Sequence, residues 1–139
     1  MSPRVRKTGP RRDVVDAVLE RAQYSCEVGG HQIAGDERGR DWSIHHRVPR
    51  GMGGTRRAEL NAPANLLLVC GSGTTGCHGA IEGSRAGAYA AGWLLPYNAD
   101  PATRPVMIEG HKKRWVLLTV DDEGVAGYQD CPPPPGVSA

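Results

Sequence analysis

The sequence predicts an α+β fold, and three of its features support this prediction. Apolar residues recur at helical spacing between Asp13 and Gln23. A Pro-free segment that ends at a glycine, residues 77–91, indicates a second helix. Short apolar runs bounded by turn residues indicate strands at 42–46, 65–70, 106–108, 115–120 and 125–128.

The N-terminal part of the chain leads from a basic segment to a short strand. Residues 1–12 carry five basic and no acidic side chains, and we expect them to form a disordered basic arm. The helix at 13–23 should pack one face on the core. Residues 24–31 have the pattern of a knuckle that presents Cys26, and a polar loop separates them from the β-prone segment 42–46, which ends in two adjacent histidines.

A long loop separates this strand from the next one. Residues 47–64 are rich in Gly and Pro and show no periodicity, and loops of this length inside a compact domain usually carry function. Residues 65–70, NLLLVC, are a near-continuous apolar run, which is consistent with a buried strand. A Gly-flanked turn at 71–76 joins it to the helix at 77–91, whose internal glycines lower its expected regularity.

The last part of the chain is predicted to be a β extension over residues 96–130. Its three strands form a small meander, with DDEG at 121–124 as a turn. The proline-rich tail at 131–139 is polyproline-like, and we expect it to be disordered. The extension and the tail therefore follow a core that spans residues 13–95.

The composition indicates one modest domain with a small core. The chain has 139 residues, of which 39% are hydrophobic and 5% aromatic, with 19 Gly and 11 Pro. A small hydrophobic core contributes little stability, so an additional stabilising element such as a bound metal ion is expected. The sequence shows no secretory signal and no membrane-spanning run, so we expect a reducing, cytoplasmic location. Its four cysteines should then be metal ligands or buried thiols rather than disulfides.

Basic residues gather in the long loop, although the formal net charge is only +2. They are Arg47, Arg50, Arg56 and Arg57. Basic clusters beside a candidate site favour a polyanionic partner such as DNA, and these four arginines are the expected phosphate contacts. For the N-terminal arm, the alternative is that its charges only keep the segment solvated.

The strongest functional signal is the order of polar residues around the two central strands and the second helix. IHHRVPRGMGG comes first, NLLLVC follows, and GCHG opens the helix. Successive side chains of a strand point to opposite faces, so His45 and His46 cannot easily ligate the same ion from an extended strand. A division between one metal ligand and one general base fits this geometry better.

With these motifs, residues 24–95 resemble the HNH nuclease family and its ββα-metal fold, most closely the small HNH proteins of bacteriophages. The resemblance implies a DNA endonuclease that hydrolyses phosphodiester bonds with a divalent ion, Mg²⁺ or Mn²⁺. It implies His45 and His78 as metal ligands and His46 as the general base. Asn65 matches the middle letter of the motif and would bridge main-chain groups of the long loop, which would hold the histidine pair.

Glu82 lies one helical turn beyond His78 and shares its face of the expected helix. It is either a further ligand, a partner that orients a ligand, or a solvated helix residue. The sequence alone favours the solvated residue.

Cys26, Cys70 and Cys77 lie where many members of the family hold a structural zinc. The usual pattern has Cys-x2-Cys before the histidine pair, but here Gly29 stands where the second thiol would be. His31 could complete a Cys₃His site, because zinc accepts imidazole as readily as thiolate. An incomplete site and buried free thiols are the alternatives.

We expect the protein to bind DNA, and we do not expect it to bind a membrane. The resemblance to phage proteins, some of them encoded beside packaging genes, also implies the host cytoplasm and the terminase or packaging proteins. A zinc-stapled nucleic-acid-binding module without catalysis is the main alternative function. A third possible function is that of a structural or assembly factor that has the same fold but no catalytic activity.

Overall fold

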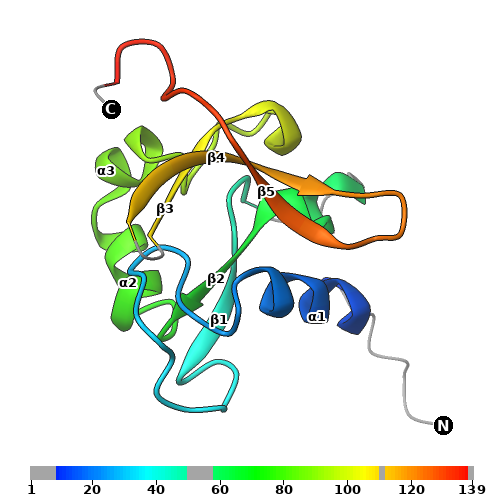
Figure 1. The fold of residues 1–139 in the computed structure, drawn as a ribbon. Coiled ribbons are helices and arrows are strands. Elements are labelled where there is room, and N and C mark those ends of the chain that lie inside the picture. Colours follow the sequence, from blue (N-terminus) through cyan, green and yellow to red (C-terminus); the bar gives the residue numbers. More distant parts are fainter. Residues whose placement is uncertain (1–8, 50–57, 110–111, 138–139) are drawn as a thin grey trace, which may run out of the picture.

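The computed structural model describes residues 9–49, 58–109 and 112–137. Over these residues the fold is α+β, as predicted, with three α-helices and two small antiparallel sheets (Figure 1). The helices are α1 (Arg12–Arg21), α2 (Gly76–Gly83) and α3 (Arg85–Ala90). The strands are β1 (Trp42–His46), β2 (Leu66–Cys70), β3 (Val106–Glu109), β4 (Lys113–Val120) and β5 (Ala126–Asp130). Short 3-10 turns are η1 (Ala58–Asn61), η2 (Pro63–Asn65) and η3 (Pro101–Thr103).

Strands β1 and β2 form the central antiparallel pair, in a register that places His46 opposite Leu66. Both faces of β2 are covered. Leu66 and Leu68 pack toward α1, whereas Leu67 and Val69 point into the main core with α2, α3, β3 and β4. Because alternate side chains leave a strand on opposite faces, burial on both sides requires the unbroken apolar run LLLV.

Helix α1 is joined to the rest of the protein by a buried charged network as well as by apolar packing. The Arg21 guanidinium donates to both carboxylate oxygens of Glu27, at 2.9 and 2.7 Å. Glu27 also accepts hydrogen bonds from the Leu68 N–H of β2 and, at 2.5 Å, from the Tyr128 hydroxyl of β5. One carboxylate therefore ties α1 to both sheets, which agrees with the position of β5 over α1 in Figure 1.

The single helix predicted at 77–91 is wrong, because two shorter helices occupy this segment. Ser84, with φ −137° and ψ 70°, interrupts the helical backbone between α2 and α3. Glycine at position 83 lowers the helical preference next to the break. Each short helix buries one side chain in the main core, Ile81 in α2 and Ala88 in α3. Gly92, at φ +77°, then ends α3.

The C-terminal sheet is the predicted meander, with the strand order β3-β4-β5. Val106 pairs with Val116, and Val116 pairs with Asp130 on its other side. The inner face of this sheet closes the main core above β2. In the described part of the chain, every helix falls short of the length or the apolar character that a membrane span requires.

Candidate metal centres

The first candidate centre gathers three cysteines and one histidine from three separate segments. Cys26 and His31 lie in the turn after α1, Cys70 ends β2, and Cys77 is in the first turn of α2. Their ligand atoms all lie within 4.8 Å of one another. The structure therefore brings together the four residues that the sequence analysis selected, and a Cys₃His group of this size could hold a metal such as zinc.

Backbone N–H groups point at the sulfur atoms of this centre. The N–H groups of Gly29 and Cys70 donate to Cys26 Sγ at 3.2 and 3.4 Å, and the Cys77 N–H donates to Cys70 Sγ at 3.3 Å. Such hydrogen bonds favour the thiolate form and fix the direction of the sulfur lone pairs. The donor set and its surroundings thus fit a metal ion that prefers sulfur and nitrogen ligands, such as zinc.

Gly29 explains how His31 can take the place of a missing fourth thiol. A Cβ atom at position 29 would lie 2.7 Å from His31 Nδ1 and 2.8 Å from Cys77 Sγ. Any side chain there would have to displace the imidazole. With glycine in place, the His31 ring enters the centre, and its Nε2 lies 3.0 Å from Cys70 Sγ.

Burial and hydrogen bonds shift the thiol pKa values of this centre in different directions. Burial raises the pKa of Cys26, and burial together with the neighbouring Cys26 sulfur raises the pKa of Cys77. Burial alone would raise the pKa of Cys70. Hydrogen bonds from Cys77 and His31 outweigh this effect, so the pKa of Cys70 is lowered overall. Several thiolates in one site repel each other, so a bound metal would have to displace protons from Cys26 and Cys77.

The second candidate centre lies where β1 meets α2. One ligand atom from each of His45, His78 and Glu82 lies within 4.8 Å of the others. The two imidazole rings have their centroids 5.3 Å apart and meet edge to face. Glu82, for which the sequence favoured a solvated position, is exposed and also pairs with Arg85 at 3.1 Å. The structure nevertheless brings its carboxylate to the two histidines.

Hydrogen bonds select the tautomer of both histidines in this second centre. His45 Nε2 lies 2.6 Å from the Trp93 carbonyl oxygen, which can only accept, so Nε2 carries the proton. The Ser43 hydroxyl donates to the Gly71 carbonyl and therefore accepts from His78 Nδ1, at 2.7 Å. The lone pairs are thus on His45 Nδ1 and His78 Nε2, as metal coordination requires.

Burial keeps both rings neutral. It lowers the pKa of His45 from 6.5 to about 4, with smaller contributions from the neighbouring His78 and His46. Burial also lowers the pKa of His78, and Glu82 partly opposes this shift. Near neutral pH the two imidazoles are therefore unprotonated and able to bind a cation.

The low pKa of His45 predicts a pH-dependent loss of stability. In the unfolded chain the ring takes up a proton as the pH falls through 6.5, whereas in the folded protein it stays neutral down to about pH 4. In this window the free energy of unfolding should fall by about 1.4 kcal/mol per pH unit. His45→Gln keeps a donor for Trp93 but does not titrate. We expect urea unfolding between pH 7.5 and 5 to show a steeper loss in the wild type than in this variant, and parallel curves would contradict the prediction.

His46 lies on the other side of β1 from the second centre, as strand alternation requires. Its Nε2 is 2.9 Å from Asn61 Oδ1, which accepts the hydrogen bond and leaves the lone pair on Nδ1. The His46 side chain is half-buried. Asn61 was not anticipated from the sequence, because an asparagine in a loop gives no signal that it will face a particular histidine.

Asn65 is fully buried and joins the two ends of the long loop. Its Oδ1 accepts from the Val48 N–H at 2.8 Å, and its Nδ2 donates to the carbonyls of Val48 and Leu60, at 3.1 and 2.9 Å. Its own carbonyl accepts from the Arg47 N–H, next to His46. These contacts are the main-chain bridge that the sequence analysis expects of this residue.

The prediction of a phosphate contact at Arg47 is wrong. Its side chain is fully buried and donates only to main-chain carbonyls, so it cannot reach a DNA backbone. The acceptors are Ala64, Gly92, Pro101, Arg104 and Pro105. Arg50, Arg56 and Arg57, the other predicted phosphate contacts, lie outside the described residues.

Comparisons with family models, curated proteins and solved structures give no match for this chain. The functional argument therefore depends on the geometry of the two centres and on the residues around them.

Proposed function

We propose that this protein is a metal-dependent DNA endonuclease of the HNH type, in which β1, β2 and α2 form the ββα-metal unit. The observation that carries the proposal is the cluster of His45, His78 and Glu82, with both imidazoles in metal-binding tautomers. Two neutral imidazoles suit a divalent transition-metal ion, and the carboxylate and the remaining water positions suit Mn²⁺ or Mg²⁺. Three protein ligands leave positions for water and for phosphate oxygens.

In this proposal His46 is the general base. A divalent ion in the second centre would stabilise the negative charge that develops on the phosphate and on the leaving oxygen. His46 follows the ligand His45 directly and would address the other side of the reacting phosphate, where its Nδ1 would accept the proton of the attacking water. Asn61 holds the ring through Nε2, and Asn65 holds the main chain that follows it. Phosphodiester bonds are very inert, so positioning and charge stabilisation must both contribute to the rate.

The cluster of Cys26, His31, Cys70 and Cys77 is, in the same proposal, a structural zinc site. Its four protein donors complete a tetrahedron and leave no position for a substrate. Cys77 directly precedes His78 in α2. A zinc ion there would therefore anchor the helix turn that carries a ligand of the second centre.

The proposal is tested by nicking of supercoiled plasmid. The wild type should nick the DNA when Mg²⁺ or Mn²⁺ is added and not when both are omitted. His46→Ala should reduce the rate by about 10²–10⁴-fold, because it removes the base but none of the proposed ligands. His111→Ala, which removes a histidine outside the motif, is the matched control and should nick like the wild type.

The rival function, a zinc-stapled module that binds nucleic acid without cutting it, gives a different result. In that case the wild type and His46→Ala bind DNA equally, and neither nicks it with any ion. Nicking that continues unchanged in His46→Ala would instead show that another group activates the water.

A further inference from the structure

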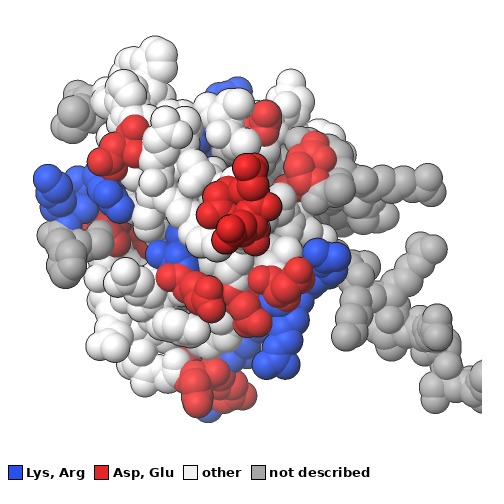
Figure 2. All heavy atoms as spheres, turned by 45° about the vertical axis from the view of Figure 1, so that its right-hand side comes forward, with Lys and Arg blue, Asp and Glu red and all other residues white. Residues whose placement is uncertain are grey.

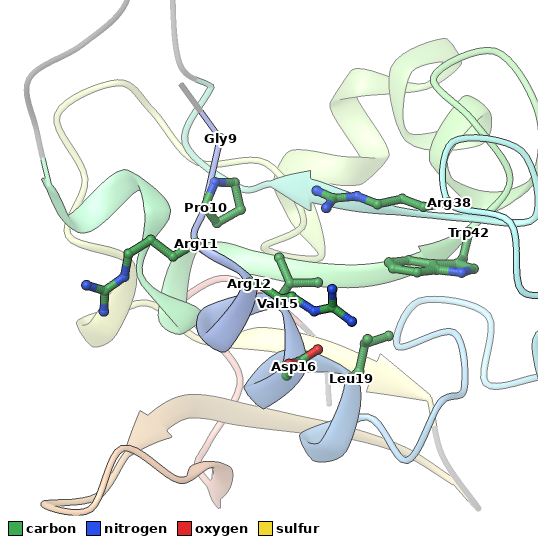
Figure 3. Close-up of a pocket in the computed structure, with 9 residues that line it drawn as sticks. All are labelled: Gly9, Pro10, Arg11, Arg12, Val15, Asp16, Leu19, Arg38 and Trp42. Atoms are coloured by element: carbon green, nitrogen blue, oxygen red, sulfur yellow. The ribbon is translucent and has the colours of Figure 1, made fainter. Parts of the chain in front are cut away.

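A pocket of about 580 Å³ lies on the α1 side of β1, away from both metal centres. Figure 3 shows it between the first turns of α1 and the start of β1. Its apolar floor includes Val15 and Leu19 of α1, and its polar lining includes Arg12, Arg38, Asp16 and Trp42. Arginine side chains at a surface pocket suit phosphate groups, which they contact in complexes with duplex DNA.

The basic side chains of this pocket are available for a ligand. Arg12 and Arg38 are exposed, and neither forms an ion pair within the part of the chain that the structure describes. The Arg38 guanidinium lies 5.8 Å from the centre of the Trp42 ring, which limits the orientations it can adopt. In Figure 3 the guanidinium groups of Arg12 and Arg38 both lie near Trp42, whereas that of Arg11 points away.

The position of the pocket along β1 relates it to the proposed general base. Trp42 and His46 are the first and last residues of β1 and are separated by an even number of positions, so their side chains leave the same face. Four residues of a strand span about 13 Å, which is the rise of about four base pairs of duplex DNA. A duplex that passes His46 could therefore reach the pocket.

Charged side chains of both signs lie on the face shown in Figure 2. Figure 2 shows acidic side chains across the middle and the bottom of the face it presents, with basic side chains gathered at the lower right and at the left edge. In the sequence, the residues before Gly9 include Arg4, Arg6 and Lys7 and no acid. A polyanion is attracted to such basic regions and repelled by the acidic ones, so charge directs it to a particular path.

We propose that the pocket formed by Arg12, Arg38 and Trp42 binds the DNA backbone on the His46 side of β1, at the opposite end of the strand from His46. This inference rests on the proposed function, since DNA is the polymer that would extend from His46 to the pocket. Arg12 and Arg38 neutralise phosphates, and Trp42 holds Arg38 in position. The pocket thus takes the role that the sequence analysis gave to Arg47.

The test measures binding of a fluorescein-labelled 20-base-pair DNA duplex by anisotropy, without added divalent ions, between 50 and 200 mM salt. Loss of two phosphate contacts in Arg12→Ala/Arg38→Ala should reduce the salt slope by about 1.8. The wild-type affinity should then fall about tenfold more over this range than that of the variant. Arg40→Ala/Lys113→Ala removes the same charge from exposed side chains that pair with acids, and it should behave like the wild type.

An equal loss of affinity and slope in the two double variants would overturn the proposal, since only net charge would then matter. Displacement of the duplex by polyglutamate as effectively as by unlabelled DNA would overturn the assignment to DNA. Because no divalent ion is present, binding is measured independently of cleavage. The binding experiment can therefore refute the role of the pocket without refuting the nuclease activity, and the nicking experiment can do the reverse.

Discussion

Removal of the zinc ion that we propose for the Cys₃His centre is expected to abolish the cooperative thermal unfolding of the protein. The Cys₃His centre joins the turn after α1, the end of β2 and the start of α2, at the edge of the main core. Zinc binding contributes on the order of 10–16 kcal/mol in small zinc domains, as much as the whole net stability of a typical domain. We therefore expect a zinc-free chain to lose its folded circular dichroism signal and to regain it when zinc is returned.

The cysteines provide a matched pair of variants for this experiment. Cys77→Ser removes a ligand and should lower both the zinc content, measured by elemental analysis, and the melting temperature. Cys131→Ser changes the one cysteine that lies outside the centre, and it should keep one zinc per chain and the wild-type melting temperature. A zinc-free protein that melts at the wild-type temperature would show that the four side chains only pack together.

Arg47→Ala is expected to lower the free energy of unfolding by about 3–5 kcal/mol. Five carbonyl groups, from η2 through residue 105, converge on this one guanidinium at 2.9–3.3 Å. Burial lowers the pKa of Arg47 to about 9, so the side chain remains charged at neutral pH. The substitution would leave buried carbonyls without donors and open a cavity. Urea unfolding at pH 7.5 measures the loss.

Two further variants separate this structural role from a general effect of charge. Arg47→Lys keeps the charge but has only three donors, so it should still cost at least about 2 kcal/mol. Arg104→Ala removes an exposed arginine whose carbonyl remains available to Arg47, and it should change stability by less than about 0.5 kcal/mol. If Arg47→Ala keeps the wild-type stability but binds DNA more weakly, Arg47 contacts DNA and its structural role is refuted.

The local elements could be predicted because local patterns determine them. The strand at 42–46 and the apolar run after Asn65 occur with nearly the predicted bounds, and α1 begins one residue earlier than predicted. The helix after His78 was predicted as one element, because a run without proline does not reveal a backbone break at Ser84. Ile81 and Ala88, one on each side of that break, are both buried in the main core.

The sequence also selected the histidines and cysteines of both metal centres, but not Glu82 or the groups that orient the histidines. Histidine and cysteine are few and chemically distinctive, so their order along the chain is informative. Ser43, Asn61 and the Trp93 carbonyl act through contacts with histidines that lie 15 to 48 positions away in the chain. Serine, asparagine and a backbone oxygen are common, so no local pattern identifies their partners.

By itself, the sequence determined the fold class, the order of the elements and which imidazoles and thiols could meet. Only the tertiary structure decided what the charged residues do. Arg47 and Glu27 look like surface residues in the sequence, but their charges are buried and satisfied by groups from distant segments. Glu82 reaches the two histidines for the same reason, since the pairing of β1 with β2 and the packing of α2 set its surroundings. The role of a charge depends on what surrounds it in space, and those neighbours come from parts of the chain that a local pattern does not include.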